Sequence, residues 1–165
     1  MFKFFIYAFL FFIAALLQTV IAPRIEVLGV QPSFLLILTA MVAFRHGGLA
    51  GCLMGFVSGL FCDVYAPIEW LGAYSLAYCV VGFIVGQINE SFIDLNLFLQ
   101  IVMLALVNFL KDIIYYFSIG KTISEVPKMV FSFTLPNTLY TVIIGTVCLY
   151  LFSQSMGKRA EIIYK

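Results

Sequence analysis

Long apolar runs, separated by short polar breaks, make up almost the whole of this chain. Each run approaches the roughly 20 residues that an α-helix needs to cross the hydrocarbon core of a bilayer. The pattern therefore predicts an all-α protein, a compact bundle of six transmembrane helices in a single integral membrane domain, 1–165. The approximate bounds of the predicted spans are 4–22, 27–44, 48–64, 70–88, 95–119 and 129–152.

Pro32 lies inside the first turns of the second predicted span. Because proline is favoured at the first position of a helix, we expect the regular helix to begin at Pro32 or Ser33. From there to Phe44 such a helix is only about 18–20 Å long, whereas the bilayer core is about 30 Å thick. Either residues 27–31 continue as irregular backbone inside the protein, or the helix stops short.

Pro136 is a second helix break, inside the sixth predicted span. It has no backbone N–H, so it leaves a carbonyl of the preceding turn without its usual donor. Thr134 and Asn137 stand beside it, and their side chains can satisfy backbone groups exposed by such a break. The arrangement indicates either local repair of the helix or a ligand site.

The composition excludes a soluble globular fold. Apolar residues make up 64% of the chain, charged residues make up 10%, and the mean hydropathy is +1.11, whereas a globular domain is about 45–50% apolar and about 25% charged. The net charge of +1 gives no indication of nucleic-acid binding. The four cysteines lie in apolar runs without a C-x-x-C pair, so we expect no disulfide, no metal site and no cofactor.

Six spans place both termini on the same side of the membrane. If that side is cytoplasmic, it holds five basic residues and the opposite side holds three, while Lys111 belongs to neither. The difference favours cytoplasmic termini by the positive-inside rule. The five are Lys3, Arg45, Lys158, Arg159 and Lys165, and the three are Arg24, Lys121 and Lys128.

Glycine recurs at every fourth position of the third span, at Gly51, Gly55 and Gly59, and Asp63 takes the next position. In a soluble helix each interior glycine costs about 1 kcal/mol relative to alanine, but in lipid small residues let two helix backbones approach closely. We expect this row to pack against another helix, either of the same chain or of a partner. Asp63 is expected to be an interfacial cap, or a buried anchor bonded to another helix or to a partner.

The fifth span carries Asn108, Lys111 and Asp112. Charged side chains within a membrane span normally face protein interior or water. Asn108 and Asp112 share one helix face, whereas Lys111 lies about 100° away from Asp112 around the helix. We therefore expect Lys111 to pair with Asp63 or to snorkel. The three residues predict a polar network between helices, with a transport or proton path as the alternative.

Gln18, near the end of the first span, is expected to form an interhelical hydrogen bond. The polar side chains predicted to form one buried network are Gln18, Asp63, Asn108, Lys111, Asp112 and Asn137. No enzyme is predicted, because the single histidine, His46, lies in a turn and the sequence has no serine-hydrolase, zinc-protease or ATP-binding motif.

The order of these features resembles the rod-shape-determining MreD family over essentially the whole chain. The ordered set of motifs, the chain length and the six predicted spans carry the resemblance together. The resemblance rests on Leu16-Leu17-Gln18, Gln31-Pro32 with the following Phe34-Leu35-Leu36-Ile37-Leu38, Gly47, the glycine row to Asp63, Gly72-Ala73-Tyr74-Ser75-Leu76-Ala77-Tyr78, Asp112 and Asn137.

The resemblance implies a non-catalytic inner-membrane scaffold of the bacterial cell-wall elongation machinery. Such a scaffold binds MreC directly, works in one complex with MreB, RodA and the transpeptidase partner of RodA, and controls rod shape and lateral peptidoglycan synthesis. We expect an exposed groove or face of the lipid-embedded bundle to receive the membrane segment of MreC. The family is also similar in fold to substrate-binding components of energy-coupling-factor transporters, so the alternative function is a membrane subunit of a transporter that binds a small, vitamin-like molecule.

Overall fold

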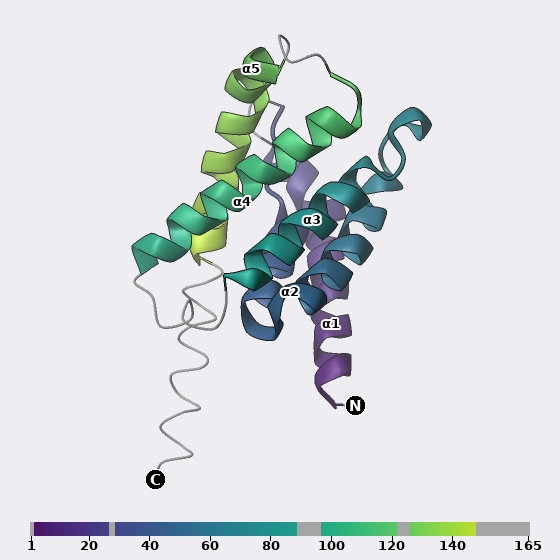
Figure 1. Cartoon of the computed structure of the whole chain (residues 1–165), viewed down its shortest axis with the longest axis vertical. Helices are drawn as coiled ribbons and strands as arrows, with labels where there is room; N and C mark the ends of the chain where they lie inside the picture. The colour runs from purple at the N-terminus through teal and green to yellow at the C-terminus, as the bar shows by residue number, and fades with distance from the viewer. Residues whose placement is uncertain (1, 27–28, 89–96, 122–125, 148–165) are drawn as a thin grey trace.

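The structure is a computed structural model that describes residues 2–26, 29–88, 97–121 and 126–147 (Figure 1). The regular elements in these segments are helices. The α-helices are α1 (Phe2–Leu16), α2 (Phe34–Asp63), α3 (Ala73–Gln87), α4 (Leu97–Ser118) and α5 (Val126–Met129). Two π-helical turns, η1 (Leu17–Ile21) and η5 (Val130–Thr134), and two 3₁₀ turns, η2 (Ala22–Ile25) and η3 (Ile68–Trp70), adjoin them. Residues 135–147 are again α-helical and form one continuous helical span with α5 and η5.

Five helical stretches in the described segments are long and apolar enough to cross a membrane. They are Phe5–Ile25, Phe34–Asp63, Ile68–Gln87, Ile101–Ser118 and Val126–Val147. The sequence predicted six spans, and the difference arises in α2, which contains most of the second and third predicted spans. Parts of the predicted spans at 27–28, 95–96 and 148–152, and the basic residues of the C-terminal tail, lie outside the described residues.

α2 is not a straight helix, because its backbone leaves helical geometry at Gly47, where φ is 82° and ψ is −178°. Thr39 and Ser58 lie 19 residues apart, which is about 28 Å along a straight helix, yet the Thr39 hydroxyl donates to the Ser58 hydroxyl over 3.2 Å. The two arms of α2, residues 34–46 and 48–63, therefore run antiparallel. The positive φ at Gly47 is the left-handed region that favours glycine.

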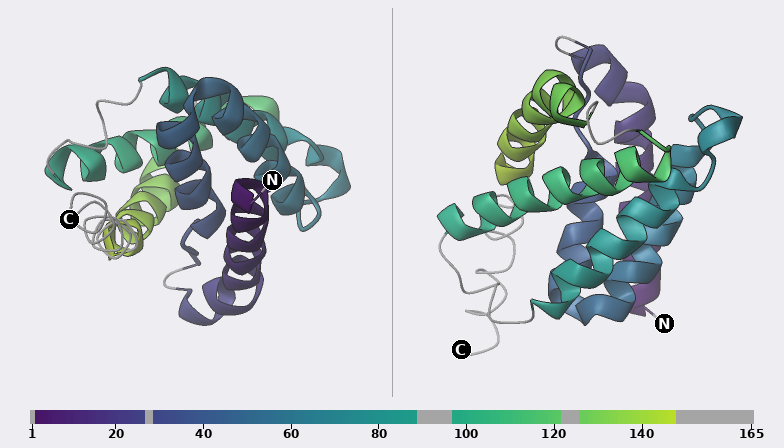
Figure 2. Two further views of the ribbon diagram at one scale, coloured as in Figure 1. Left: turned by 90° about the horizontal axis from the view of Figure 1, so that it is seen from below. Right: turned by 45° about the horizontal axis from the view of Figure 1, so that its top comes forward.

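The first arm of α2 lies at the centre of the protein. Residues 35–40, 42 and 43 are all buried, and α1 and the final helix lie on either side of this arm (Figures 1 and 2). The second arm packs along α3 (Figure 1). In the most apolar window of α2, 61% of the residues are buried, against 17% in the first span and in the last. The outer helices thus turn most of their apolar surface away from the protein, as expected where lipid is the solvent.

The regular part of α2 begins at Phe34, so the helix start predicted at Pro32 or Ser33 is wrong by one or two residues. Ser33 has φ −97° and ψ 81°, which is not helical. Val30, Pro32 and Ser33 are buried all the same. An irregular segment therefore lies inside the protein ahead of α2.

The interruption predicted at Pro136 takes the form of a π-helical turn, and the helix does not end there. η5 ends two residues before the proline, and α-helix resumes at residue 135. A π turn widens the helix by one residue, which accommodates the backbone around a proline that cannot donate. The first span has the same arrangement, because η1 precedes Pro23.

Candidate functional site

The glycine row of the second arm of α2 is covered by α3. A Cβ atom added at Gly51, Gly55 or Gly59 would lie within 3.0 Å of α3 backbone atoms, closer than real Cβ atoms come. The atoms met belong to Gly82, Tyr78 and Ser75 respectively. The two helices thus touch backbone to backbone, the contact that small residues permit in membranes. The row is a seam within this chain and is not open to a partner.

Asp63, the last residue of α2, joins this seam to the start of α3. Its side chain is buried, with Oδ1 accepting from the backbone N–H of Tyr74 and Oδ2 from that of Ser75, each over 3.0 Å. The Ser75 hydroxyl donates to the same Oδ2. The N-cap residue of α3 is Gly72, which has no side chain to offer. Asp63 therefore supplies the acceptor and the negative charge that the helix N-terminus favours.

The protein contains a cavity of about 620 Å³. The elements that line it meet at the end of the bundle away from the N-terminus (Figure 1). Its walls come from η1, from the segment before α2, from the last turn of the second α2 arm and from the first half of α3. The later part of α4 and the helix of residues 126–147 complete them. The lining includes Gln18, Lys111, Asp112 and Asn137, four of the six residues predicted to form a polar network. Asp63 and Asn108 do not line it.

Lys111 and Asp112 form a buried ion pair in the cavity wall, with 2.7 Å between Lys111 Nζ and Asp112 Oδ1. The side chains are only 4% and 9% exposed. The pairing expected of Lys111, with Asp63 or with the membrane surface, is therefore wrong. Although consecutive residues point about 100° apart on a helix, the long lysine side chain bends back toward the carboxylate beside it. Both residues line the same cavity.

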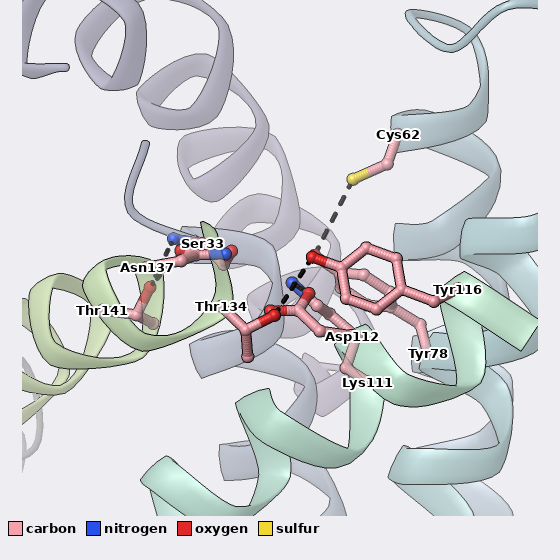
Figure 3. Close-up of polar contacts among 9 residues, drawn as sticks. All are labelled: Ser33, Cys62, Tyr78, Lys111, Asp112, Tyr116, Thr134, Asn137 and Thr141. Atoms are coloured by element: carbon pink, nitrogen blue, oxygen red, sulfur yellow. Dashed lines mark hydrogen bonds and ion pairs between the residues drawn. The ribbon is translucent and has the colours of Figure 1, made fainter. Parts of the chain in front are cut away.

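The second oxygen of the same carboxylate, Asp112 Oδ2, is buried and accepts no hydrogen bond within the described part of the protein. Close to it, the Tyr116 hydroxyl contacts Thr134 Oγ1 over 3.1 Å and so joins α4 to η5 (Figure 3). A buried acceptor without a donor costs about 1–3 kcal/mol, more where it is charged. Asp112 Oδ2 is therefore the acceptor in this cavity that most needs a partner.

Hydrogen bonds hold the irregular segment before α2 from two sides. Gln18 Oε1 accepts from the backbone N–H of Phe34 over 2.9 Å. On the other side the backbone N–H of Ser33 donates to Thr141 Oγ1 over 3.3 Å, and that hydroxyl donates to Asn137 Oδ1 over 3.2 Å (Figure 3). Both π-helical spans are thereby tied to the start of α2.

Asn108 lies one turn before Asp112 on α4 and is fully buried. Neither its Nδ2 nor its Oδ1 has a hydrogen-bond partner among the described residues. The hydrogen bonds within those residues therefore group the six predicted polar side chains into separate sites and do not join them into one network.

Tyrosines make up a large part of the cavity lining, and the sequence pattern did not predict them as site residues. Tyr74 and Tyr115 stack with ring centroids 4.2 Å apart and an interplanar angle of 22°. The tyrosines that line the cavity are Tyr65, Tyr74, Tyr78, Tyr115 and Tyr116. The sequence spacing could have indicated two of them. Tyr115 and Tyr116 follow Lys111 and Asp112 by four residues each and so lie on the same helix faces.

In the described segments, no three histidine, cysteine, aspartate or glutamate side chains come close enough together to hold a metal ion. Cys62 lines the cavity and donates a weak hydrogen bond to the Tyr78 hydroxyl over 3.9 Å. Cys52 and Cys79 meet across the α2–α3 seam, with their sulfur atoms 2.8 Å apart.

These features define a class of protein: a helical membrane protein whose helices pack through small residues and enclose a polar cavity at one end. A family model described as rod shape-determining protein MreD matches residues 1–156. The chain therefore belongs to the MreD family, which confirms the resemblance drawn from the sequence. No match was found among the curated proteins or among the solved structures, so the likeness to energy-coupling-factor components stays a prediction.

Family membership gives the broad role of the chain. The MreD family determines rod shape during cell-wall elongation, as part of the rod-shape complex, and is a family of scaffolds. With its membrane-length helices, the chain is an integral protein of the inner membrane.

Proposed function

We propose that this chain is a non-catalytic scaffold that binds MreC directly, in one complex with MreB, RodA and the transpeptidase partner of RodA. The observation that carries the proposal is the family match, which extends over residues 1–156. The structure supports it through a tightly packed interior combined with a poorly covered first span. Such a bundle can hold its own shape and still offer a helix to a partner.

The proposed topology is a single membrane domain with six crossings and both termini in the cytoplasm. The antiparallel arms of α2 support this count, because each arm runs the opposite way from the other. Each arm is short, about 20–24 Å at 1.5 Å per residue, and the irregular residues 30–33, of which all but Gln31 are buried, extend the first arm. In this topology the cavity faces the periplasmic side.

We assign the MreC contact to an apolar stripe on α1. Its members are Phe5, Phe9, Phe12 and Leu16, which are 68%, 65%, 61% and 47% exposed. The spacing of four, three and four residues places all of them on one face of the helix. A membrane helix that packs against this face gains dispersion contacts along about three turns. The glycine row cannot serve this purpose, because α3 covers it.

Co-purification with MreC tests this assignment. The double variant Phe9→Ala with Phe12→Ala should lose most of the MreC that the unaltered chain retains. The matched control is Leu49→Ala with Leu53→Ala, two residues that are 75% and 61% exposed on the second arm of α2. Retention of MreC by the α1 variant, or equal loss from both variants, would contradict the α1 assignment.

The second candidate function, a vitamin-binding membrane subunit of a transporter, is favoured by the cavity, whose volume lies within the about 300–1,000 Å³ usual for small-molecule sites. A thermal-shift screen with vitamins tests it, since a ligand at 100 times its Kd adds about 2.7 kcal/mol to stability. A saturable shift with one vitamin would favour the transporter, and none across the panel would count against it.

A further inference from the structure

The cavity is lined by more polar side chains than a scaffold needs in order to fold. It is lined by a buried ion pair, five tyrosines and the side-chain amides of Gln18, Gln31 and Asn137. A purely structural end of a bundle would bury fewer costly groups, because a well-packed apolar pair of similar size is often as stable as a buried ion pair, or more stable. This surplus of polar groups points to a ligand.

The ion pair sets the hydrogen-bonding pattern that a ligand must match. Asp112 uses Oδ1 for Lys111 and leaves the buried Oδ2 without a partner in the described protein, so it takes a donor. The Lys111 ammonium has three N–H donors, and its contact with Asp112 uses one of them. A complementary ligand therefore carries a donor and an acceptor side by side, as a pair of neighbouring hydroxyl groups does.

The charge of the cavity selects an uncharged ligand. Lys111 and Asp112 are the only charged side chains among the described lining residues, and they neutralise each other. An anion would face the Asp112 carboxylate and a cation would face the Lys111 ammonium, each within a few ångströms. At that range like charges repel strongly in a low-dielectric interior.

The tyrosines in the cavity lining favour a ligand that contains a ring with an apolar face. Tyr74 and Tyr115 are partly exposed and line the cavity as a stacked pair with ring centroids 4.2 Å apart, and Tyr78 and Tyr116 line it at buried positions. Aromatic rings offer large apolar contact area with a polar group at the edge. A sugar ring matches this wall, because its C–H face is apolar and its hydroxyl groups point outward from the rim.

We propose that the cavity binds an uncharged sugar ring, with one hydroxyl donating to Asp112 Oδ2 and a neighbouring oxygen accepting from Lys111. The sugar could arrive free in solution or as the headgroup of a membrane lipid, and the chemistry at the ion pair is the same in both cases. The proposal does not depend on MreC binding, so either one can fail without the other.

The test is a thermal-shift assay on the full chain in nanodiscs of phosphatidylcholine. This lipid carries neither a sugar nor a pair of hydroxyl groups, and sugar-based detergents are avoided because their headgroups would occupy the site. One arm adds glucose or N-acetylglucosamine to the solution, and another adds monoglucosyl diacylglycerol to the nanodisc. Choline chloride and sodium phosphate serve as the cation and the anion for comparison.

We expect a saturable rise of several degrees in Tm with sugar, and none with choline or phosphate. A rise in both sugar arms identifies the ring itself as the ligand, whereas a rise with the glycolipid alone identifies a lipid headgroup. No rise in either arm, or a larger rise with choline or phosphate, would overturn the proposal. A rise with a vitamin but with no sugar would overturn it in favour of the transporter function.

Two variants distinguish a loss of sugar binding from a loss of folding. Lys111→Met with Asp112→Leu removes both charges together and leaves neither one unpaired, so the fold should persist while the sugar-induced shift is lost. Tyr115→Leu removes one stacked ring at a half-buried position and should weaken binding at least tenfold. An undiminished shift in the charge-free variant would show that the sugar binds elsewhere and would contradict the proposal.

Discussion

Asp63 accepts hydrogen bonds from both the backbone N–H and the hydroxyl of Ser75, twelve residues further along the chain. This contact fixes the end of the second α2 arm to the start of α3 across a short connection. It also supplies the cap that Gly72 cannot provide. The carboxylate therefore holds the architecture together, and both of its oxygens already accept hydrogen bonds from the start of α3.

Replacement of Asp63 by alanine should destabilise the fold by about 2–4 kcal/mol, because it leaves buried donors at the start of α3 without an acceptor. Thermal unfolding of the purified chain in lipid nanodiscs measures the effect. Glu69→Gln is the control, since Glu69 is an acidic residue nearby with an exposed side chain. Equal stability of the two variants would show that the Asp63 cap contributes little.

Gly55→Ala should destabilise the protein by about 1–3 kcal/mol through overpacking, although the same change in an open helix usually stabilises. The added methyl group meets the backbone of Tyr78, which cannot move without separating α2 from α3. The matched control is Gly145→Ala, where the nearest atom is the flexible end of the Leu104 side chain. Thermal unfolding of both variants gives the comparison, and a neutral Gly55→Ala would contradict the close seam.

Mild oxidation should link Cys52 to Cys79 within one chain, because their sulfur atoms are 2.8 Å apart across the seam. Copper phenanthroline is the oxidant, and mass spectrometry after alkylation counts the free thiols that remain. Cys52→Ser should leave Cys79 free, and Cys62 should stay reduced in either case. Crosslinking between chains in place of the internal bond would show that this α2–α3 pairing is incorrect.

Lys111→Met alone should cost about 3–5 kcal/mol of stability, since it leaves the Asp112 carboxylate buried and unpaired. Addition of Asp112→Leu to the same chain should recover most of this loss. Lys128→Met, at an exposed position, provides the control for loss of one positive charge. Additive losses in the double variant would mean that the two side chains do not interact.

Much of the fold could be predicted from the sequence, because apolar runs and glycine spacing are local signals. The close approach at Gly55 follows from the small-residue rule. The sequence predicted a turn between the second and third spans, and α2 does reverse there, at Gly47; the positive φ that makes the reversal leaves no trace in the sequence beyond the glycine itself. The π turns before Pro23 and Pro136 were likewise hidden, because only tertiary packing decides how a helix accommodates a proline.

The site was harder to predict because it depends on contacts distant in sequence. Lys111 was expected to reach beyond its own helix, on the basis of ideal side-chain directions, but the cavity beside it lets the flexible chain bend toward Asp112. The tyrosine wall joins Tyr74 on α3 to Tyr115 on α4. A single sequence gives no direct evidence of such a pairing.

Photo-crosslinking in growing cells shows which surface of the chain contacts MreC. The photoreactive residue p-benzoylphenylalanine is placed at Phe9 on the exposed stripe of α1, or at Leu53 on the second arm of α2, and crosslinked products are probed for MreC. We expect a strong MreC adduct from Phe9 and little or none from Leu53. An adduct from Leu53 alone, or no MreC adduct from Phe9 in a chain that supports rod shape, would contradict the assignment of the MreC contact to α1.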